Sequence, residues 1–344
     1  MNFAERLQAI WYRTEPPPLA LRALVPLYAG LRNLYRLPYR LGLRTSQRLP
    51  LPVIVVGNLT VGGSGKTPLV LALIDALRER GWNPGVISRG YGGKATIPMR
   101  VDDDSDPALV GDEPCLIRQR SGAPLAVARR RTDAGRLLLL DESEIPPNVL
   151  IADDGLQHIA LARDIEICVI DGVRRFGNGY LLPAGPLREP LVRLAHIPFH
   201  VVNGDMSNDG EISMQLSIDG VVSLLDASHR ESLASWSGRR VHAVAGIGNP
   251  DRFFHQLRDA GIVVIEHPLP DHHPFVIEDV SFNDDLPVLM TEKDAIKCRA
   301  FADKQMHYVE ISAMLPTTFF EDIDARLKRC SQRFQRSNVR HSRQ

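Results

Sequence analysis

Cysteines are scarce and scattered in this sequence. The four cysteines of the 344-residue chain lie at positions 115, 168, 298 and 330, without a Cys-x-x-Cys pair. This spacing argues against a disulfide framework or a zinc site and favours a reducing compartment. The chain also lacks a run of about eighteen uncharged apolar residues, so we expect no membrane-spanning helix. We expect no signal peptide either, because charged residues come early.

Acidic residues are missing from one long segment. None occurs between Glu15 and Asp75, although the chain carries 41 acidic and 41 basic side chains, a formal net charge of zero. The balanced total excludes a global polyanion-binding field, and we expect no nucleic-acid partner. Within the acid-free segment, arginines recur every four residues among leucines and tyrosines, at positions 32, 36, 40, 44 and 48.

A basic, aromatic-bearing amphipathic segment of this kind favours contact with an anionic membrane surface. The alternative is a helix pair packed on the protein with solvated arginines. Pro26 and Pro38 predict that the segment divides into shorter helices.

Strand, loop and helix patterns alternate from about residue 52. Short apolar runs, rich in β-branched residues, predict buried parallel strands at 52–56, 84–88, 124–128, 149–153 and 165–171. Amphipathic stretches between them predict helices, so we expect an α/β fold whose parallel sheet carries helices on both faces. The polar segment 203–238 is predicted to be a surface hairpin or a crossover to a second, smaller α/β lobe.

The stretch VGGSGKTP, residues 61–68, follows the first predicted strand and opens a helix. A phosphate-binding loop needs converging backbone amides, a lysine for charge and a hydroxyl for magnesium. Lys66 and Thr67 supply the last two. We therefore expect nucleotide contacts from Thr60, Val61, Gly62, Gly63, Ser64, Gly65, Lys66 and Thr67. Thr60 occupies a position where the usual P-loop pattern has glycine.

Two acidic residues follow the predicted strand VLIA. Asp153 and Asp154 stand where a magnesium-binding acid belongs in P-loop proteins, and either one is a candidate beside Thr67. Asp-Asp-Gly is also good turn chemistry, which is the structural alternative. A guanine-binding motif would need lysine where TEKD has Glu292, so the sequence disfavours a GTPase.

Six motifs occur in order: GNLTVGGSGKTP, SRGYGG, GDEP, DDGLQH, LLPAGPLREP and TEKDAIKC. Together they resemble the tetraacyldisaccharide 4′-kinase family of lipid A biosynthesis, over roughly residues 5–325. In that family the loop usually reads Thr at the position of Thr60. The resemblance implies a membrane-associated P-loop kinase on the cytoplasmic face of the bacterial inner membrane. Its reaction would transfer the γ-phosphate of ATP, with Mg²⁺, to the 4′-hydroxyl of a tetraacyldisaccharide 1-phosphate.

The resemblance also suggests catalytic residues. Asp112 in GDEP is the candidate general base, with a helix N-cap as its structural alternative. His272 or His273 would pair with it, and the resemblance favours His272. Lys66 would contact the β- and γ-phosphates, and Arg188 would neutralise charge on the transferred phosphoryl group.

Further residues are expected to line the cleft and meet the glycolipid substrate. Glu189 would orient Arg188 or the sugar, and Gln157 and His158 would lie in the same cleft. Arg89 and Tyr91 would contact the sugar or phosphate, with loop packing as their alternative.

These assignments divide the chain into four predicted segments. They are N-terminal amphipathic membrane-associating helices (1–48), a P-loop kinase core (49–205), a smaller α/β lobe (206–328) and a basic, disordered tail (329–344). The oligomeric state stays open, and a monomer is compatible with the sequence. Two rival functions remain: a soluble synthetase or small-molecule kinase of the dethiobiotin-synthetase type, and a nucleotide-gated membrane adaptor.

Overall fold

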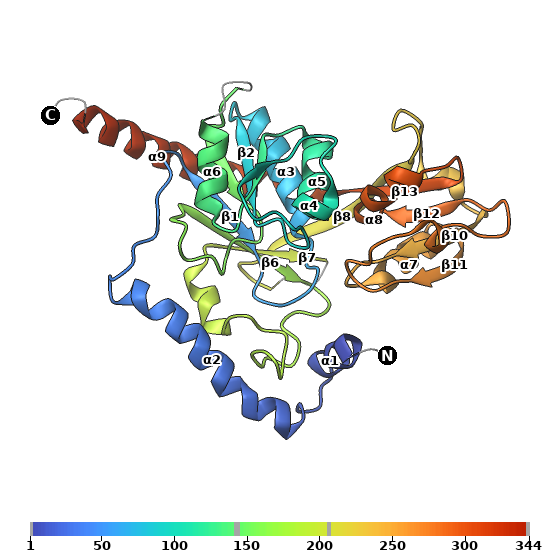
Figure 1. Cartoon of the computed structure of the whole chain (residues 1–344), viewed down its shortest axis with the longest axis horizontal. Helices are drawn as coiled ribbons and strands as arrows, with labels where there is room; N and C mark the ends of the chain where they lie inside the picture. Colours follow the sequence, from blue (N-terminus) through green and yellow to red (C-terminus); the bar gives the residue numbers. More distant parts are fainter. Residues whose placement is uncertain (1–2, 141–144, 205–207, 342–344) are drawn as a thin grey trace.

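The structure is a computed structural model that describes residues 3–140, 145–204 and 208–341. Figure 1 shows a central sheet flanked by helices, a smaller lobe at the right and a long N-terminal helix running along the lower edge. The strands are β1 Val53–Gly57, β2 Pro84–Ser88, β3 Met99–Arg100, β4 Leu125–Val127, β5 Val149–Ala152, β6 Ile165–Asp171, β7 Phe199–Asn203, β8 Ile212–Ser223, β9 Arg230–Glu231, β10 Arg240–Ala245, β11 Val263–Pro268, β12 Val288–Thr291 and β13 Met306–Met314. The α-helices are α1 Phe3–Trp11, α2 Leu19–Arg40, α3 Lys66–Glu79, α4 Pro107–Val110, α5 Asp112–Ser121, α6 Arg131–Leu139, α7 Pro250–Asp259, α8 Glu292–Cys298 and α9 Thr317–His341.

The core sheet has the strand order β8-β7-β6-β1-β5-β2-β4-β3. Its neighbouring strands pair in parallel from β8 to β4, and β3 adds an antiparallel edge. The carboxyl ends of β1 and β5 therefore meet at one edge of the sheet, which brings the phosphate-loop motif beside the paired aspartates.

Both faces of β1 are buried, as a parallel strand between two helical layers requires. Successive side chains alternate between the faces. Ile54 belongs to the same buried cluster as Leu73 of α3, and Val55 belongs to the cluster that contains Leu138 of α6. The sequence prediction of a P-loop-type α/β core is confirmed.

The smaller lobe carries its own parallel sheet, in the order β11-β10-β12-β13. Strand β8 joins the two sheets, because its first residues pair in parallel with β7 and its later residues pair antiparallel with β13. The polar segment after residue 203 thus contains a crossover strand. The predicted boundary at 205/206 falls on residues outside the described part of the chain.

Helix α2 is continuous from Leu19 to Arg40, with Pro26 and Pro38 inside it. The prediction that these prolines divide the segment was wrong. A proline has a helix-compatible φ and removes one backbone hydrogen bond. On an exposed helix, water can satisfy the carbonyl that the proline leaves free. The helix ends before Arg44 and Arg48, which therefore do not continue its arginine row.

The C-terminal segment also differs from its prediction. Helix α9 runs through His341, so it crosses residue 329, where we expected a disordered tail to begin. Its first half is anchored, because Phe319, Ile323 and Leu327 are buried in the same core cluster as Phe199. An anchored helix propagates more easily than an isolated one, and local composition does not reveal that support.

Candidate active site

The phosphate-loop motif forms a tight turn between β1 and α3. Gly62 and Gly65 have φ values of 104° and 92°, which side chains other than glycine rarely adopt. A Cβ atom on Gly65 would lie 2.5 Å from the side-chain nitrogen of Asn203, so this position also needs glycine for space. Asn203 donates to the Ser64 carbonyl at 3.1 Å, and the buried Ser64 hydroxyl has no partner in the described structure.

A later segment packs against the start of this loop. The Val61 amide donates to the Pro186 carbonyl at 2.9 Å, and the Arg188 amide donates to the Leu59 carbonyl at 2.7 Å. Thr60 lies opposite Leu187 in an isolated antiparallel bridge. These backbone contacts explain how Arg188, far away in sequence, reaches the phosphate loop.

Asp154 forms ion pairs with two cationic side chains of the site. Lys66 Nζ lies 3.6 Å from Asp154 Oδ1, and Arg188 Nη1 lies 3.0 Å from Asp154 Oδ2. Arg188 also donates to Gln157 Oε1 at 3.2 Å. Burial alone would raise the pKa of Asp154, but Lys66 and Arg188 outweigh it and hold the pKa below its ordinary value. The predicted residues Lys66, Asp154 and Arg188 therefore form one charged group.

Asp153 has a different environment. It is 1 % exposed, and its Oδ1 atom has no hydrogen-bond partner in the described structure. Burial, followed by the charges of Glu113 and Asp154, raises the pKa of Asp153 to about 7. Arg131 fixes the aspartate turn by donating to the carbonyls of Asp153 at 3.0 Å and Asp154 at 2.7 Å.

Asp112 is the first residue of α5, and it does not cap the helix. Gly111 is the N-cap residue, with a φ of 96°, and a Cβ atom there would lie 2.7 Å from the Tyr91 carbonyl. The structural alternative that we considered for Asp112, an N-cap, is therefore wrong. Its carboxylate points instead toward the smaller lobe, and the positive end of the helix favours the charge there.

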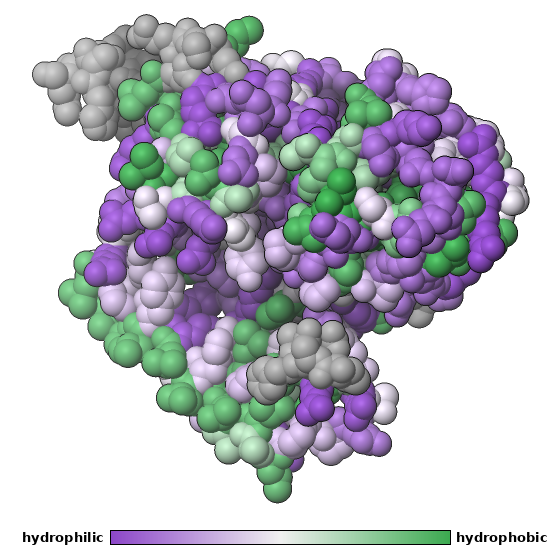
Figure 2. All heavy atoms as spheres, turned by 45° about the vertical axis from the view of Figure 1, so that its right-hand side comes forward, coloured by the Kyte–Doolittle hydropathy of each residue, from purple (hydrophilic) through white to green (hydrophobic). Residues whose placement is uncertain are grey.

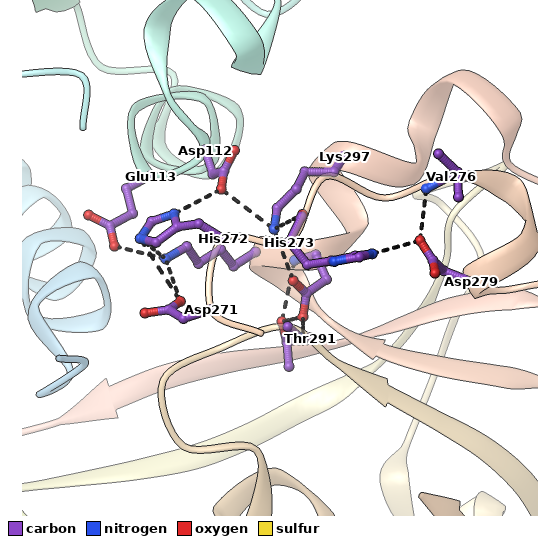
Figure 3. A network of polar contacts seen from close by, with 12 residues as sticks. Asp112, Glu113, Asp271, His272, His273, Val276, Asp279, Thr291 and Lys297 are labelled. Carbon is purple, nitrogen blue, oxygen red and sulfur yellow. Dashed lines mark hydrogen bonds and ion pairs between the residues drawn. The ribbon is translucent and has the colours of Figure 1, made fainter. Parts of the chain in front are cut away.

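The two adjacent histidines have separate partners (Figure 3). His272 Nδ1 lies 3.4 Å from Asp112 Oδ2, whereas His273 Nε2 lies 2.8 Å from Asp279 Oδ2. His272 has a φ of 60°, so the chain turns sharply between the two side chains. Of the two histidines, His272 is the one that reaches Asp112 across the lobes.

Glu189 is nearly inaccessible to solvent at 2 % and sits between α2 and the cleft. Arg36 donates to its Oε2 atom at 2.5 Å, and Gln157 donates to its Oε1 atom at 3.3 Å. Gln157 also donates to the Asn58 carbonyl at 2.9 Å. Glu189 thus links the N-terminal helix to the residues around Arg188.

Arg89, Tyr91 and His158 lie nearby but have few specific contacts. Tyr91 is 68 % exposed, and its ring centre lies 5.3 Å from that of His272. Arg89 is exposed, and its charge is one of those that lower the pKa of His158. Burial is the larger cause and, together with Arg131, brings the pKa of His158 to about 4, so its ring is neutral.

Several residues of the site were assigned no role from the sequence, although Glu113 and Lys297 stand inside the motifs GDEP and TEKDAIKC. Arg174 donates to the carboxylate of Asp171 at 2.9 Å and to the Gly63 carbonyl, and it lies over the Tyr12 ring. It braces the phosphate loop against the end of β6. The other residues that sequence reasoning missed are Glu113, Arg131, Asn203 and Lys297. Only their three-dimensional contacts identify them.

Comparison with known proteins identifies the family of the chain. A family model described as tetraacyldisaccharide-1-P 4′-kinase matches residues 18–328. The tetraacyldisaccharide 4′-kinase of Methylobacillus flagellatus is 50 % identical over 328 residues, covering 95 % of this chain and 97 % of the relative. That of Stenotrophomonas maltophilia is 48 % identical over 327 residues, covering 92 % and 95 %.

A solved structure gives the same result. The crystal structure of "apo" form LpxK from Aquifex aeolicus in complex with ATP superposes with a TM-score of 0.73 at 27 % identity. The match covers 90 % of this chain and 98 % of that one. With the family model spanning most of its length, the chain belongs to the tetraacyldisaccharide-1-P 4′-kinase family.

Proposed function

We propose that this chain transfers the γ-phosphate of ATP to the 4′-hydroxyl of a tetraacyldisaccharide 1-phosphate. The product is the 4′-phosphorylated lipid A precursor of lipopolysaccharide biosynthesis. The proposal rests on the observation that two groups of site residues lie next to each other. Lys66, Asp154 and Arg188 stand at the phosphate loop, and Asp112 with His272 stands beside them. Burial raises the pKa of Glu113, next to Asp112, but Lys293 and then Lys66 lower it, so Glu113 lies within reach of both charges.

The chemical step exchanges one P–O bond for another. The 4′-oxygen attacks the γ-phosphorus, the bond to the β,γ-bridging oxygen breaks, and ADP leaves with that electron pair. The hydroxyl proton passes to Asp112, which is ionised at neutral pH. Its own burial favours protonation, but the hydrogen bond from His272 and the charge of Lys297 lower the pKa of Asp112.

Positioning and charge neutralisation supply most of the catalysis in phosphoryl transfer. Backbone amides of the glycine-rich turn surround the phosphates, and Lys66 contacts the β- and γ-phosphates. Arg188 neutralises charge that develops on the transferred group. Its contact with Asp154 at 3.0 Å holds the guanidinium at the phosphate loop.

The residues present also fit a magnesium ion. Mg²⁺ prefers hard oxygen ligands, keeps several waters and needs one or two protein carboxylates. The unpartnered Oδ1 of buried Asp153 would serve as such a ligand, and Thr67 and Asp154 would supply a hydroxyl and a second carboxylate. Bound there with ATP, the ion would neutralise charge on the β- and γ-phosphates.

The glycolipid would meet the residues between the two groups. Glu189, nearly inaccessible and held by Arg36 and Gln157, would act on the sugar through Gln157, whose side chain it positions. The neutral ring of His158 and the exposed side chains of Arg89 and Tyr91 line the approach. We assign these residues to substrate binding rather than to the chemical step.

The N-terminal helix α2 supports a peripheral membrane contact. One side faces the protein, where Tyr28 donates to the Arg188 carbonyl at 3.0 Å and Arg36 meets Glu189. The opposite side carries exposed leucines, and Figure 2 shows apolar surface gathered along this lower edge of the molecule. The exposed leucines of α2 are Leu19, Leu24, Leu27, Leu31, Leu34 and Leu37.

An exposed apolar face beside arginines is suited to an anionic lipid interface. None of the helices in the described part of the chain is long and apolar enough to span a bilayer. We therefore propose that the chain binds the cytoplasmic face of the inner membrane peripherally, through α2.

Replacing Leu27, Leu31 and Leu34 by Gln tests the membrane contact. We expect the triple variant to lose sedimentation with anionic phospholipid vesicles, while its activity on micellar substrate is affected less. A matched triple variant at exposed apolar positions elsewhere, Leu140, Leu225 and Ile277, should sediment like wild type. Equal sedimentation of both triple variants would rule out α2 as the membrane contact.

Transfer of label tests the reaction itself. Purified protein is incubated with γ-labelled ATP and tetraacyldisaccharide 1-phosphate in mixed micelles, beside the Lys66→Ala variant. Labelled, bisphosphorylated lipid from wild type alone is the expected result. No labelled lipid from folded, ATP-binding wild type would overturn the proposal. The family match and the substrate of its named relatives leave the soluble synthetase and the membrane adaptor without support.

A further inference from the structure

Helix α8 presents two lysines to the Asp112–His272 pair. Figure 3 shows one of them, Lys297, beside Asp112. Lys293 and Lys297 stand four residues apart and therefore lie on the same side of the helix. Thr291 fixes the start of α8, because its hydroxyl accepts a hydrogen bond from the Asp294 amide at 3.3 Å. The two ammonium groups are thus delivered to the cleft by a capped, rigid element.

Lys297 lies beside the carboxylate of Asp112. Its Nζ atom is 3.6 Å from Asp112 Oδ2, 3.3 Å from Asp294 Oδ1 and 3.2 Å from the His273 carbonyl oxygen. The side chain is 9 % exposed, and its Nζ atom stands 5.0 Å from the centre of the Phe275 ring. These contacts on several sides hold the ammonium group of Lys297 next to Asp112.

The counter-ion of Lys297 is itself fixed. Asp294 is fully buried at 0 % exposure, and its Oδ2 atom accepts from the Gly246 amide at 2.9 Å. The same oxygen accepts from the Thr291 hydroxyl at 2.6 Å. The backbone of the smaller lobe therefore determines where Lys297 stands, and through it where the Asp112 carboxylate is held.

Lys293 contacts His272. Its Nζ atom lies 3.2 Å from Glu113 Oε1, 3.5 Å from His272 Nε2 and 3.7 Å from Asp271 Oδ1. An ammonium group only donates hydrogen bonds, so Nε2 must offer its lone pair. The ring proton then resides on Nδ1, from which it is donated to Asp112 Oδ2 at 3.4 Å.

We infer that Lys293 and Lys297 are positioning residues for the Asp112–His272 pair. Lys293 selects the neutral histidine tautomer with its proton on Nδ1, and Lys297 keeps the Asp112 carboxylate ionised and oriented. The inference rests on the proposed role of Asp112 as the base. It also gives the TEKDAIK segment a function at the acceptor side of the site.

Charged side chains from α8 and from the segment around His272 surround the Asp112–His272 pair. Asp112 faces His272, Lys297 and Lys293, and His272 faces Asp112, Asp271 and Lys293. Burial raises the pKa of Asp112, while His272 and the two lysines lower it to a net value below the ordinary one. Removing Lys297 leaves the burial and takes away an opposing charge, so the pKa of Asp112 must rise.

The pH dependence of kcat tests Lys297. In Lys297→Met we expect the acidic limb to move to higher pH by about one unit or more, as for loss of an opposite charge in contact. Lys297→Arg should restore most of the wild-type profile, and Lys297→Gln, which retains a donor, serves if the methionine variant is unstable. Exposed Lys304→Met is the matched control. Wild-type limbs in folded Met and Gln variants would overturn the assignment.

Nitrogen-15 histidine spectra test Lys293 without reference to activity. The His272 signals are identified by their loss in His272→Gln. In wild type at neutral pH we expect a protonated Nδ1 and a bare Nε2, and in Lys293→Met a shift toward the other tautomer. A wild-type ring protonated on Nε2, or an unchanged tautomer in Lys293→Met, would overturn the assignment.

Failure of Asp112 as the base and failure of its positioning by the lysines would give different results. Full turnover by Asp112→Asn would remove the proposed base, whatever the lysines do. Loss of turnover in Asp112→Asn together with an unshifted limb in Lys297→Met would keep the base and reject its positioning by the lysine.

Discussion

The two sides of the candidate active site are built in different ways. The phosphate side comes from neighbouring strand ends of one sheet: the loop after β1 carries Lys66, and the turn after β5 carries Asp154. The acceptor side is assembled across the lobes, because Asp112 begins α5 of the core while His272 lies 160 residues away in the smaller lobe.

This difference predicts different sensitivities. The phosphate side depends on backbone geometry within one sheet, so we expect its residues to affect every reaction of the nucleotide. The acceptor side depends on how the two lobes meet, so its residues should affect transfer to the lipid more than binding of ATP. Substitutions that separate ATP binding from lipid phosphorylation test whether the two sides are independent.

The largest effect is expected on the phosphate side. Lys66→Ala should reduce kcat/KM for lipid phosphorylation by about 10³-fold or more, because a preorganised charge on the transferred group is lost. The measurement is label transfer from ATP, with exposed Lys304→Ala as the control. Residual activity within tenfold of wild type would show that Lys66 does not carry the phosphate charge.

Asp112→Asn is expected to separate the two sides. We predict a fall in kcat of roughly 10²–10⁴-fold, typical of a lost general base, with little change in the Kd for ATP. Asp104→Asn, an exposed aspartate on the same connecting segment, should behave like wild type. If the variant lost ATP binding in proportion to kcat, the two sides would not be independent.

A smaller effect is expected where the N-terminal helix meets the site. Arg36→Gln leaves the buried Glu189 without its 2.5 Å partner, so we expect the KM for the lipid to rise several-fold, up to about tenfold, with the KM for ATP unchanged. Arg40→Gln removes the same charge one turn later on an exposed side chain. The excess effect of Arg36→Gln over Arg40→Gln measures the contact with Glu189. Equal effects would assign both to membrane attraction.

The same comparison explains what could be predicted from the sequence. The phosphate loop, its preceding strand and the acids after β5 are contiguous motifs, and their chemistry follows from residue type and short spacing. Arg188 was found only through the family resemblance, since backbone contacts with Leu59 and Pro186 bring it to the loop.

The acceptor side was harder to predict because its contacts join distant segments. Neither composition nor spacing indicates that Lys297 reaches Asp112, or that Gly111 rather than Asp112 is the N-cap residue of α5. The sequence rule that proline breaks a helix also overestimated the effect of Pro26 in α2. The rule does not consider the contacts of Tyr28 and Arg36 that hold this helix against the protein.

The smallest effect concerns stability, and it tests whether the acceptor side also holds the lobes together. The pKa of Asp112 lies below its ordinary value of 3.8 because His272 and the lysines of α8 outweigh its burial. A depressed carboxyl pKa stabilises the fold above the unfolded pKa, and this contribution is lost as the pH falls through the folded pKa. The gap in free energy of unfolding between wild type and Asp112→Asn should therefore be largest near neutral pH and should shrink as the pH falls below about 4, the unfolded pKa of an aspartate. Asp104→Asn should show no such gap, because that side chain is exposed. A stability gap that widened on acidification would mean that the ionised carboxylate of Asp112 destabilises the folded protein. Asp112 would then be kept ionised at the expense of the contact between the lobes.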